Sequence, residues 1–187
     1  SALPADQRQQ TLVELTGRYK ANPTDRATAI QYAAALRAAG QPQQASAALE
    51  QAMAAYPRDI EITVAYAKAL TAQGSFEQAV SVLDTVIRPD APDWNALLVR
   101  GAALDQLGRH GEARAHYAQA AISAPGEASI ETNLGLSFAM TNDLPQAEQH
   151  LRRAVQMRGA SSQTRQNLAL VVGLQGRFEE CRALYAD

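Results

Sequence analysis

One spacing organises this chain. Glycine or asparagine recurs every 34 residues at the same point of the pattern, in the series Gly40, Gly74, Gly108, Asn142 and Gly176. Both residue types tolerate the left-handed backbone that follows a helix and opens a turn. A period of this length is typical of one helix-turn-helix unit repeated along the chain. This constrains the fold more than any other feature of the sequence.

Placing each of these residues at position 15 of a unit defines the boundaries without any insertion. The predicted repeats are 26–59, 60–93, 94–127, 128–161 and 162–187, of which the last is incomplete. The pattern predicts an all-α fold, a right-handed superhelical solenoid of tetratricopeptide (TPR) helix-turn-helix repeats in one continuous domain. Residues 1–25 fit half a repeat, a single helix that covers the N-terminal end of the stack.

Small and large residues occupy fixed positions of the repeat, as this fold requires. Positions 8 and 20 are small because two helices approach closely there, and a larger side chain would overpack the contact. Position 8 holds Ala33, Ala67, Gly101, Gly135 and Ala169. Position 20 holds Ala45, Ala79, Ala113, Ala147 and Cys181. Large apolar residues at positions 11 and 24, such as Leu36 and Leu49, form the stripe that packs inside each hairpin.

Three departures from the pattern carry expectations of their own. Pro89 lies earlier than the other prolines that end a unit, so the second helix of repeat two should stop early. Asn142 and Gly159 both suit a left-handed turn. Arg100 occupies a core position, where its stem can pack while its charged head reaches solvent.

Composition excludes several classes of function. The net charge is −2 and no run of Lys or Arg indicates a nucleic-acid surface. One cysteine excludes an internal disulfide and is compatible with the cytoplasm and the periplasm alike. No apolar run reaches the ~20 residues that span a membrane. The chain begins at Ser1 without methionine, so we expect any targeting segment to lie upstream.

No pattern indicates catalysis. Phosphate-binding loops, dinucleotide fingerprints, zinc-protease motifs and nucleophile elbows are all missing from the sequence. His110, His116 and His150 are interpreted as surface residues, because a metal site needs converging ligands. Cys181 is interpreted as a buried, inert thiol at a small position. We therefore predict no catalytic, cofactor-binding or metal-binding residue, and no enzyme activity.

The candidate binding surface is the concave groove lined by the first helix of each repeat. Positions 2, 5, 9, 12 and 13 of that helix should face it. The residues predicted to bind a peptide there are Ile30, Val64, Lys68, Leu98, Asp105, Thr132, Leu136, Met140, Gln166, Leu170 and Leu174. Contiguous exposed apolar side chains often mark interaction sites, here for an amphipathic helix or an extended apolar peptide.

Another interpretation stays open for the same residues. Ile30 and Val64 could equally contact the neighbouring first helix and belong to the edge of the core. The cluster of Leu136, Met140, Leu170 and Leu174 favours the groove.

The C-terminal half carries more than the generic repeat. The segments 93–105, 108–113 and 129–137 and, most specifically, the run from Gly159 to Glu180 (with Arg165-Gln166-Asn167-Leu168 and Gly176-Arg177-Phe178-Glu179-Glu180) resemble the TadD family of tight-adherence (Flp-type) pilus assembly proteins. The resemblance covers about residues 26–187.

The resemblance implies a periplasmic lipoprotein at the outer membrane, a pilotin-like adaptor for the secretin ring of the pilus machine. The partner would be a peptide segment of the secretin or of another pilus-assembly component, with no nucleic acid involved. Contact with the membrane would pass only through a lipid-bearing cysteine upstream of Ser1, since Cys181 cannot take that role. Family members continue past the equivalent of Asp187, which agrees with the lack of a polar cap at that end and leaves open whether a C-terminal capping element is missing.

Three rival hypotheses remain. The chain could be an adaptor of another envelope complex, such as one for cell-wall synthesis. It could be the substrate-selecting repeat domain of a larger enzyme, for instance a glycosyltransferase. Finally, two copies could pair through an exposed end near Val172, Leu184 and Tyr185.

Overall fold

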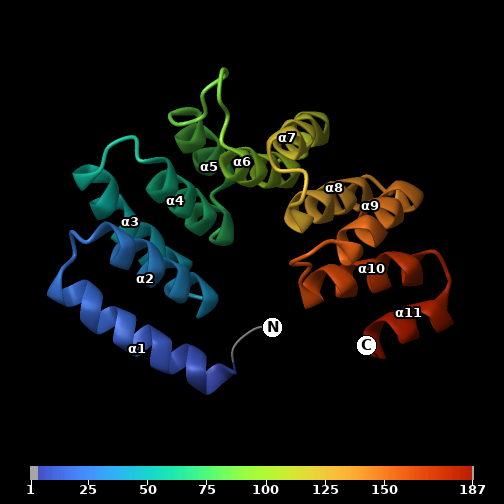
Figure 1. The fold of residues 1–187 in the computed structure, drawn as a ribbon, viewed down its shortest axis with the longest axis horizontal. Helices are drawn as coiled ribbons and strands as arrows, with labels where there is room; N and C mark the ends of the chain where they lie inside the picture. Colours follow the sequence, from blue (N-terminus) through green and yellow to red (C-terminus); the bar gives the residue numbers. More distant parts are fainter. Residues whose placement is uncertain (1–3, 187) are drawn as a thin grey trace. The chain divides into compact units, whose positions relative to one another are not determined.

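The computed structural model describes residues 4–186, so the first three residues of the predicted half-repeat and the last residue of the fifth repeat lie outside it. This part of the chain is all-helical (Figure 1). The helices are α1 (Ala5–Ala21), α2 (Arg26–Ala38), α3 (Pro42–Ala55), α4 (Ile60–Ala72), α5 (Phe76–Asp84), α6 (Trp94–Gln106), α7 (His110–Ser123), α8 (Ala128–Met140), α9 (Leu144–Gln156), α10 (Ser162–Leu174) and α11 (Phe178–Ala186).

The helices alternate between two roles. The first helix of each hairpin, called helix A below, is 13 residues long in every case: α2, α4, α6, α8 and α10. The second helix, called helix B, varies in length. The expected early stop in repeat two is confirmed, because α5 has 9 residues whereas α3 and α7 have 14.

A recurring side-chain cap begins most helices A. Asp25, Asp59 and Asp93 each accept a hydrogen bond from the backbone N–H three residues later, at the starts of α2, α4 and α6. Ser161 does the same for α10, whereas Glu127 makes no such bond for α8. Such a cap satisfies one of the backbone donors that a helix start leaves without a partner.

The turns have the backbone that their residues predict. The glycines at position 15 have φ between 75° and 85°, and Asn142 takes their place with φ 61°. Gly159 also has a positive φ of 82°, so both expectations for repeat four are confirmed. Arg58 adopts φ 61° as well, which its residue type does not predict.

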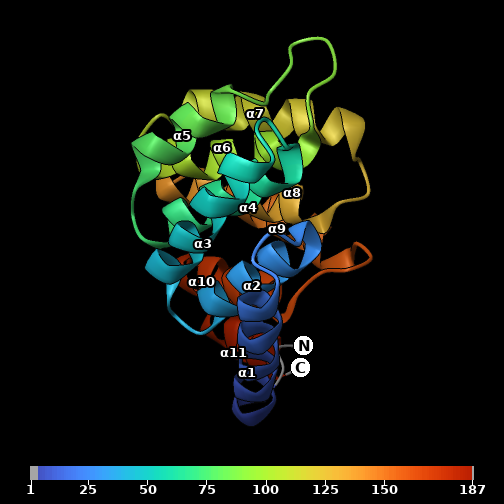
Figure 2. The same ribbon diagram turned by 90° about the vertical axis from the view of Figure 1, so that its left-hand side faces the viewer.

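Contacts divide the described chain into two compact units, of which one ends at Leu107 and the other begins at Gly108. The first unit contains α1 to α6, and α1 packs on α2 (Figures 1 and 2). Leu12 and Leu15 of α1 are buried, and the Tyr19 ring stacks on Tyr32 at 4.6 Å between centroids. Leu12, Leu15 and Tyr19 form the apolar face of the N-terminal helix.

The small positions are buried in both units. Ala33, Ala45, Ala67 and Ala79 are at most 3% exposed in the first unit, as are Ala113, Ala147 and Ala169 in the second. Gly135 of α8 shows why size matters, since a methyl group on it would lie 2.8 Å from Leu151 Cγ.

Arg100 is held by a partner within its own unit. Its Nε lies 2.9 Å from Asp84 Oδ1 at the end of α5, and its side chain is 15% exposed. The stem packs as expected, and the head, which was expected to reach solvent, binds the exposed carboxylate of Asp84 on the preceding helix B.

Two expectations about residues of the second unit, which contains α7 to α11, are wrong. His150 is not a surface residue, because its ring stacks on Phe138 at 5.4 Å and its Nδ1 lies 2.7 Å from Glu131 Oε2. Val172 is fully buried in the core with Leu151 and Leu168, so it cannot belong to an exposed pairing surface.

Candidate functional site

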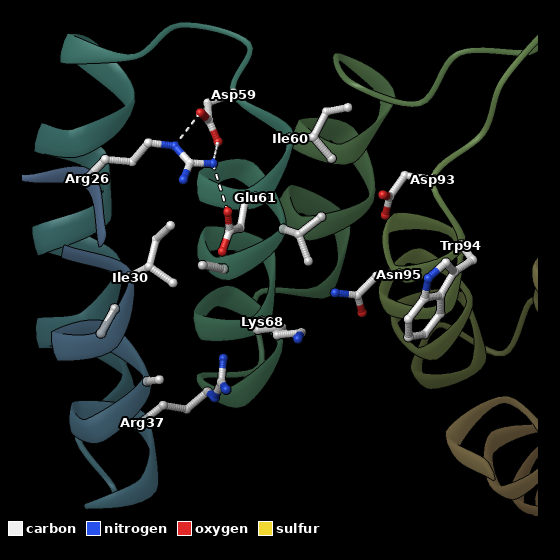
Figure 3. Close-up of a pocket in the computed structure, with 14 residues that line it drawn as sticks. Arg26, Ile30, Arg37, Asp59, Ile60, Glu61, Lys68, Asp93, Trp94 and Asn95 are labelled. Atoms are coloured by element: carbon white, nitrogen blue, oxygen red, sulfur yellow. Dashed lines mark hydrogen bonds and ion pairs between the residues drawn. The ribbon is translucent and has the colours of Figure 1, made fainter. Parts of the chain in front are cut away.

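A pocket of about 600 Å³ lies on the helices A of the first unit (Figure 3). Its floor is apolar and is formed by Ile30 and Ala34 of α2 with Val64 and Ala65 of α4. Trp94 and Asn95 face it from the first turn of α6. The spacing of these residues follows from helical periodicity, which places positions three or four residues apart on one face.

One end of the pocket holds an ion-pair cluster. Arg26 Nε donates to Asp59 Oδ2 at 2.6 Å and its Nη2 donates to Glu61 Oε2 at 2.8 Å (Figure 3). The hydrogen bonds from Arg26 lower the pKa of the Asp59 carboxyl. The sequence analysis did not predict this pair. Arg26 is the first residue of α2 and Asp59 is the residue before α4, so their places at the starts of successive helices A could have indicated it.

The other end of the pocket is cationic. Arg37, in the last turn of α2, and Lys68 of α4 point into the same region (Figure 3). Both side chains are half-buried. Burial, and then the charge of Arg37, lowers the pKa of Lys68, while burial alone lowers that of Arg37. Each shift means that the protein environment disfavours the charged form.

The second unit presents apolar residues on its helices A. Met140 of α8 is 47% exposed, and Leu170 and Leu174 of α10 are 54% and 62% exposed. Leu136 is half-buried and Gln166 is exposed. These five predicted residues remain available to a partner.

Four other predicted groove residues are buried. Val64 is 4% exposed, Asp105 5%, and Leu98 and Thr132 9% each. Thr132 bonds to Ala128 O at 2.8 Å and lies 3.1 Å from Thr164 Oγ1 on the neighbouring helix A. For Val64, Leu98 and Thr132, which share position 5, this burial favours the edge-of-core interpretation, and Asp105 is buried at position 12. Ile30 and Lys68 remain half-buried at the pocket.

No cluster of His, Cys, Asp and Glu in residues 4–186 could hold a metal ion. Cys181 is half-buried, and its Sγ would lie 3.1 Å from a methyl group placed on Gly173. None of the described helices is both long and apolar enough to cross a bilayer.

Two family models match the chain. Residues 36–101 and residues 98–164 each match a model described as tetratricopeptide repeat. None of the curated proteins matches the chain in sequence.

Several solved structures share the fold. A thermophilic TPR protein of Thermus thermophilus superposes with a TM-score of 0.78 at 22% identity, over 86% of this chain and 88% of that one. PilW, named as a widely conserved type IV pilus biogenesis factor, superposes with a TM-score of 0.74 at 14% identity, over 97% of this chain and 84% of PilW. The pilF protein of Pseudomonas aeruginosa superposes with a TM-score of 0.67 at 13% identity, over 96% of this chain and 82% of the pilF protein. At these identities the likeness concerns the fold alone.

Proposed function

Since the chain is a tetratricopeptide-repeat protein, we propose that it is a non-catalytic scaffold that captures a peptide segment of a pilus-assembly protein on its helices A. Repeats of this fold typically serve as protein-interaction modules. The preferred partner is the secretin of a tight-adherence pilus, for which the chain would act as a pilotin-like adaptor.

The observation that carries the proposal is the exposure of Leu170 and Leu174, at 54% and 62%. The two residues are four apart on α10, so their side chains lie on one face of the helix. Burial of such side chains by a bound segment contributes about 25 cal/mol per Å² before ordering costs are subtracted. A short segment that buries them can therefore bind with useful affinity.

Two further observations support a role in pilus assembly. The run from Gly159 to Glu180 resembles the TadD family, and this run contains α10 and the start of α11. A chain of the same fold, PilW, is named as a type IV pilus biogenesis factor. In this role the chain would be anchored at the periplasmic face of the outer membrane through a lipid attached upstream of Ser1.

The experiment is a calorimetric titration of the protein with the C-terminal segment of the pilus secretin encoded beside it. We expect saturable binding with a Kd of ~1 µM, which is about −8 kcal/mol. Binding of a segment from another envelope complex, with none of the secretin segment, would retain the scaffold and overturn the pilotin role. Failure of the folded protein to bind any peptide on its helices A would overturn the scaffold function itself.

A further inference from the structure

The pocket of the first unit is electrically polarised along its length. At one end the three carboxylates of Asp59, Glu61 and Asp93 accompany the single guanidinium of Arg26. At the other end Arg37 and Lys68 are the only charged groups among the described residues that line it. Along α2, Arg26 and Arg37 are separated by eleven residues, which is about 16 Å. A carboxylate on a ligand is therefore repelled at the first end and attracted at the second.

The two cations have no partner of opposite charge in the described part of the chain. No hydrogen bond or ion pair joins Arg37 or Lys68 to another residue in 4–186, whereas Arg26 makes three. A half-buried charge without a partner is unfavourable, since it loses hydration without gaining a compensating interaction. The C-terminal end of α2 offsets part of this cost for Arg37 through the helix dipole. It does not remove the repulsion between the two cations, which contributes to the lowered pKa of Lys68.

We propose that Arg37 and Lys68 together bind the side-chain carboxylate of an acidic residue in a peptide captured at the first unit, while a neighbouring apolar residue packs on Ile30. The inference rests on the proposed peptide-capture function and assigns a ligand chemistry to this pocket. A guanidinium binds a carboxylate through two parallel N–H donors, and an ammonium adds a point charge beside it. The bound carboxylate would neutralise the repulsion between the two cations.

The opposite end of the pocket adds a second element of specificity. Its surplus of carboxylates favours a basic residue of the peptide. An extended segment covers the intervening distance with about five residues, at roughly 3.3 Å each. The favoured ligand is therefore a short segment with an acidic residue at one end, an apolar residue in the middle and a basic residue at the other end.

The test is a selection from a random library of ten-residue peptides, all amidated at the C-terminus so that only side chains supply carboxylates. The wild-type protein, the double variant Arg37→Glu with Lys68→Glu, and a control with Lys20→Glu and Arg158→Glu are compared. The control makes the same change in net charge at two exposed residues away from the pocket. Circular dichroism and thermal melting establish that all three proteins are folded.

We expect the wild type and the control to enrich Asp and Glu, and the reversed variant to enrich Lys and Arg instead. In a selected peptide, replacing the acidic residue by its amide should weaken binding to the wild type about tenfold, or about 1.4 kcal/mol. Enrichment of Asp and Glu that persists in the reversed variant would overturn the assignment, as would peptides selected without charge preference. Both of these outcomes leave peptide capture intact. If the folded protein selects no peptide at all, both proposals are overturned.

Discussion

Arg26, the first residue of α2, binds Asp59, the residue that caps α4. The Arg26 guanidinium donates two hydrogen bonds to the Asp59 carboxylate, from Nε at 2.6 Å and from Nη2 at 2.9 Å. The same carboxylate accepts from the Ile62 backbone N–H at 3.0 Å. One side chain therefore both starts a helix A and joins it to the preceding helix A at one end of the pocket.

This double use predicts the cost of removing Asp59. Asp59→Ala should lower the free energy of unfolding by ~1–2 kcal/mol through the lost cap, and further through the lost ion pair. Asp25 provides the comparison, because it caps α2 through the Thr28 N–H and also accepts from the Thr28 hydroxyl, but makes no bond to an arginine. Urea melts of the two variants measure the difference. If Asp25→Ala were as costly as Asp59→Ala, the ion pair would contribute no more to stability than the hydrogen bond from the Thr28 hydroxyl.

Gly135 tests the requirement for small residues where α8 and α9 meet. A methyl group there would lie 2.8 Å from Leu151 Cγ and 3.0 Å from Ala147 O, and the latter is a backbone atom that cannot move aside easily. Gly135→Ala should lower the free energy of unfolding by ~1–3 kcal/mol despite the better helix propensity of alanine.

Gly17 provides the matched control for this substitution. It lies inside α1, with no atom within 4 Å of an added methyl group. Gly17→Ala should therefore raise the free energy of unfolding by ~0.5–1 kcal/mol. A loss in both variants, measured by thermal melting, would show that packing against Leu151 is not what makes Gly135 necessary.

The start of α8 is a place where stability can be gained. Glu127 precedes this helix with the extended backbone of a cap residue, but its side chain makes no capping bond. Glu127→Asp shortens the side chain to the length found at Asp25 and Asp93, and should add on the order of 1 kcal/mol. The melting temperature should rise by ~2–4 °C. The reverse change, Asp93→Glu, should lower it, and no change in either variant would contradict the capping account.

The protein should lose stability in acid when the Glu148 carboxylate becomes protonated. This carboxylate accepts from Arg177, from Arg152 Nε at 2.8 Å and from Gln175 Nε2 at 2.7 Å. The hydrogen bond from Arg177 is the largest cause that lowers the pKa of Glu148, from an ordinary value of 4.5 to about 2. Its stabilising contribution is therefore fully present above pH 4.5 and disappears as the pH falls toward 2.

Glu148→Gln tests this contribution. The variant should lose ~1–3 kcal/mol at neutral pH and should differ little from the wild type near pH 2. Glu179→Gln is the control, because Glu179 is 90% exposed and exposed ion pairs contribute little. Urea melts between pH 2 and pH 7 give the comparison. A constant difference between Glu148→Gln and wild type across that range would exclude the ionised carboxylate as its cause.

The sequence predicts the helices of this fold better than it predicts the surface of the candidate site. Turn residues such as Gly40 and Asn142 impose a backbone that few other residues adopt, so their spacing locates the turns. Burial at the groove depends on the neighbouring helix A instead. Val64 and Thr132 share position 5 with Gln166, yet the first two are covered and Gln166 is exposed.

Partners distant in sequence explain the other differences. His150 lies at an outward position of its own helix, but Phe138 and Glu131 of α8 cover it. Arg100 meets Asp84 across the boundary between two repeats. A pattern within one helix identifies the face of a side chain, whereas its contacts depend on residues that the period does not constrain.

The most direct test of the central claim compares two substitutions in the titration with the secretin segment. Leu170→Asp places a charge on the helix A face of the second unit, while Ile122→Asp makes the same kind of change on α7, a helix B, where Ile122 is 83% exposed. Helicity by circular dichroism should be unchanged in both. We expect Leu170→Asp to abolish binding and Ile122→Asp to leave the Kd unchanged. Binding retained by folded Leu170→Asp and lost in Ile122→Asp would place the partner on helices B and contradict the account.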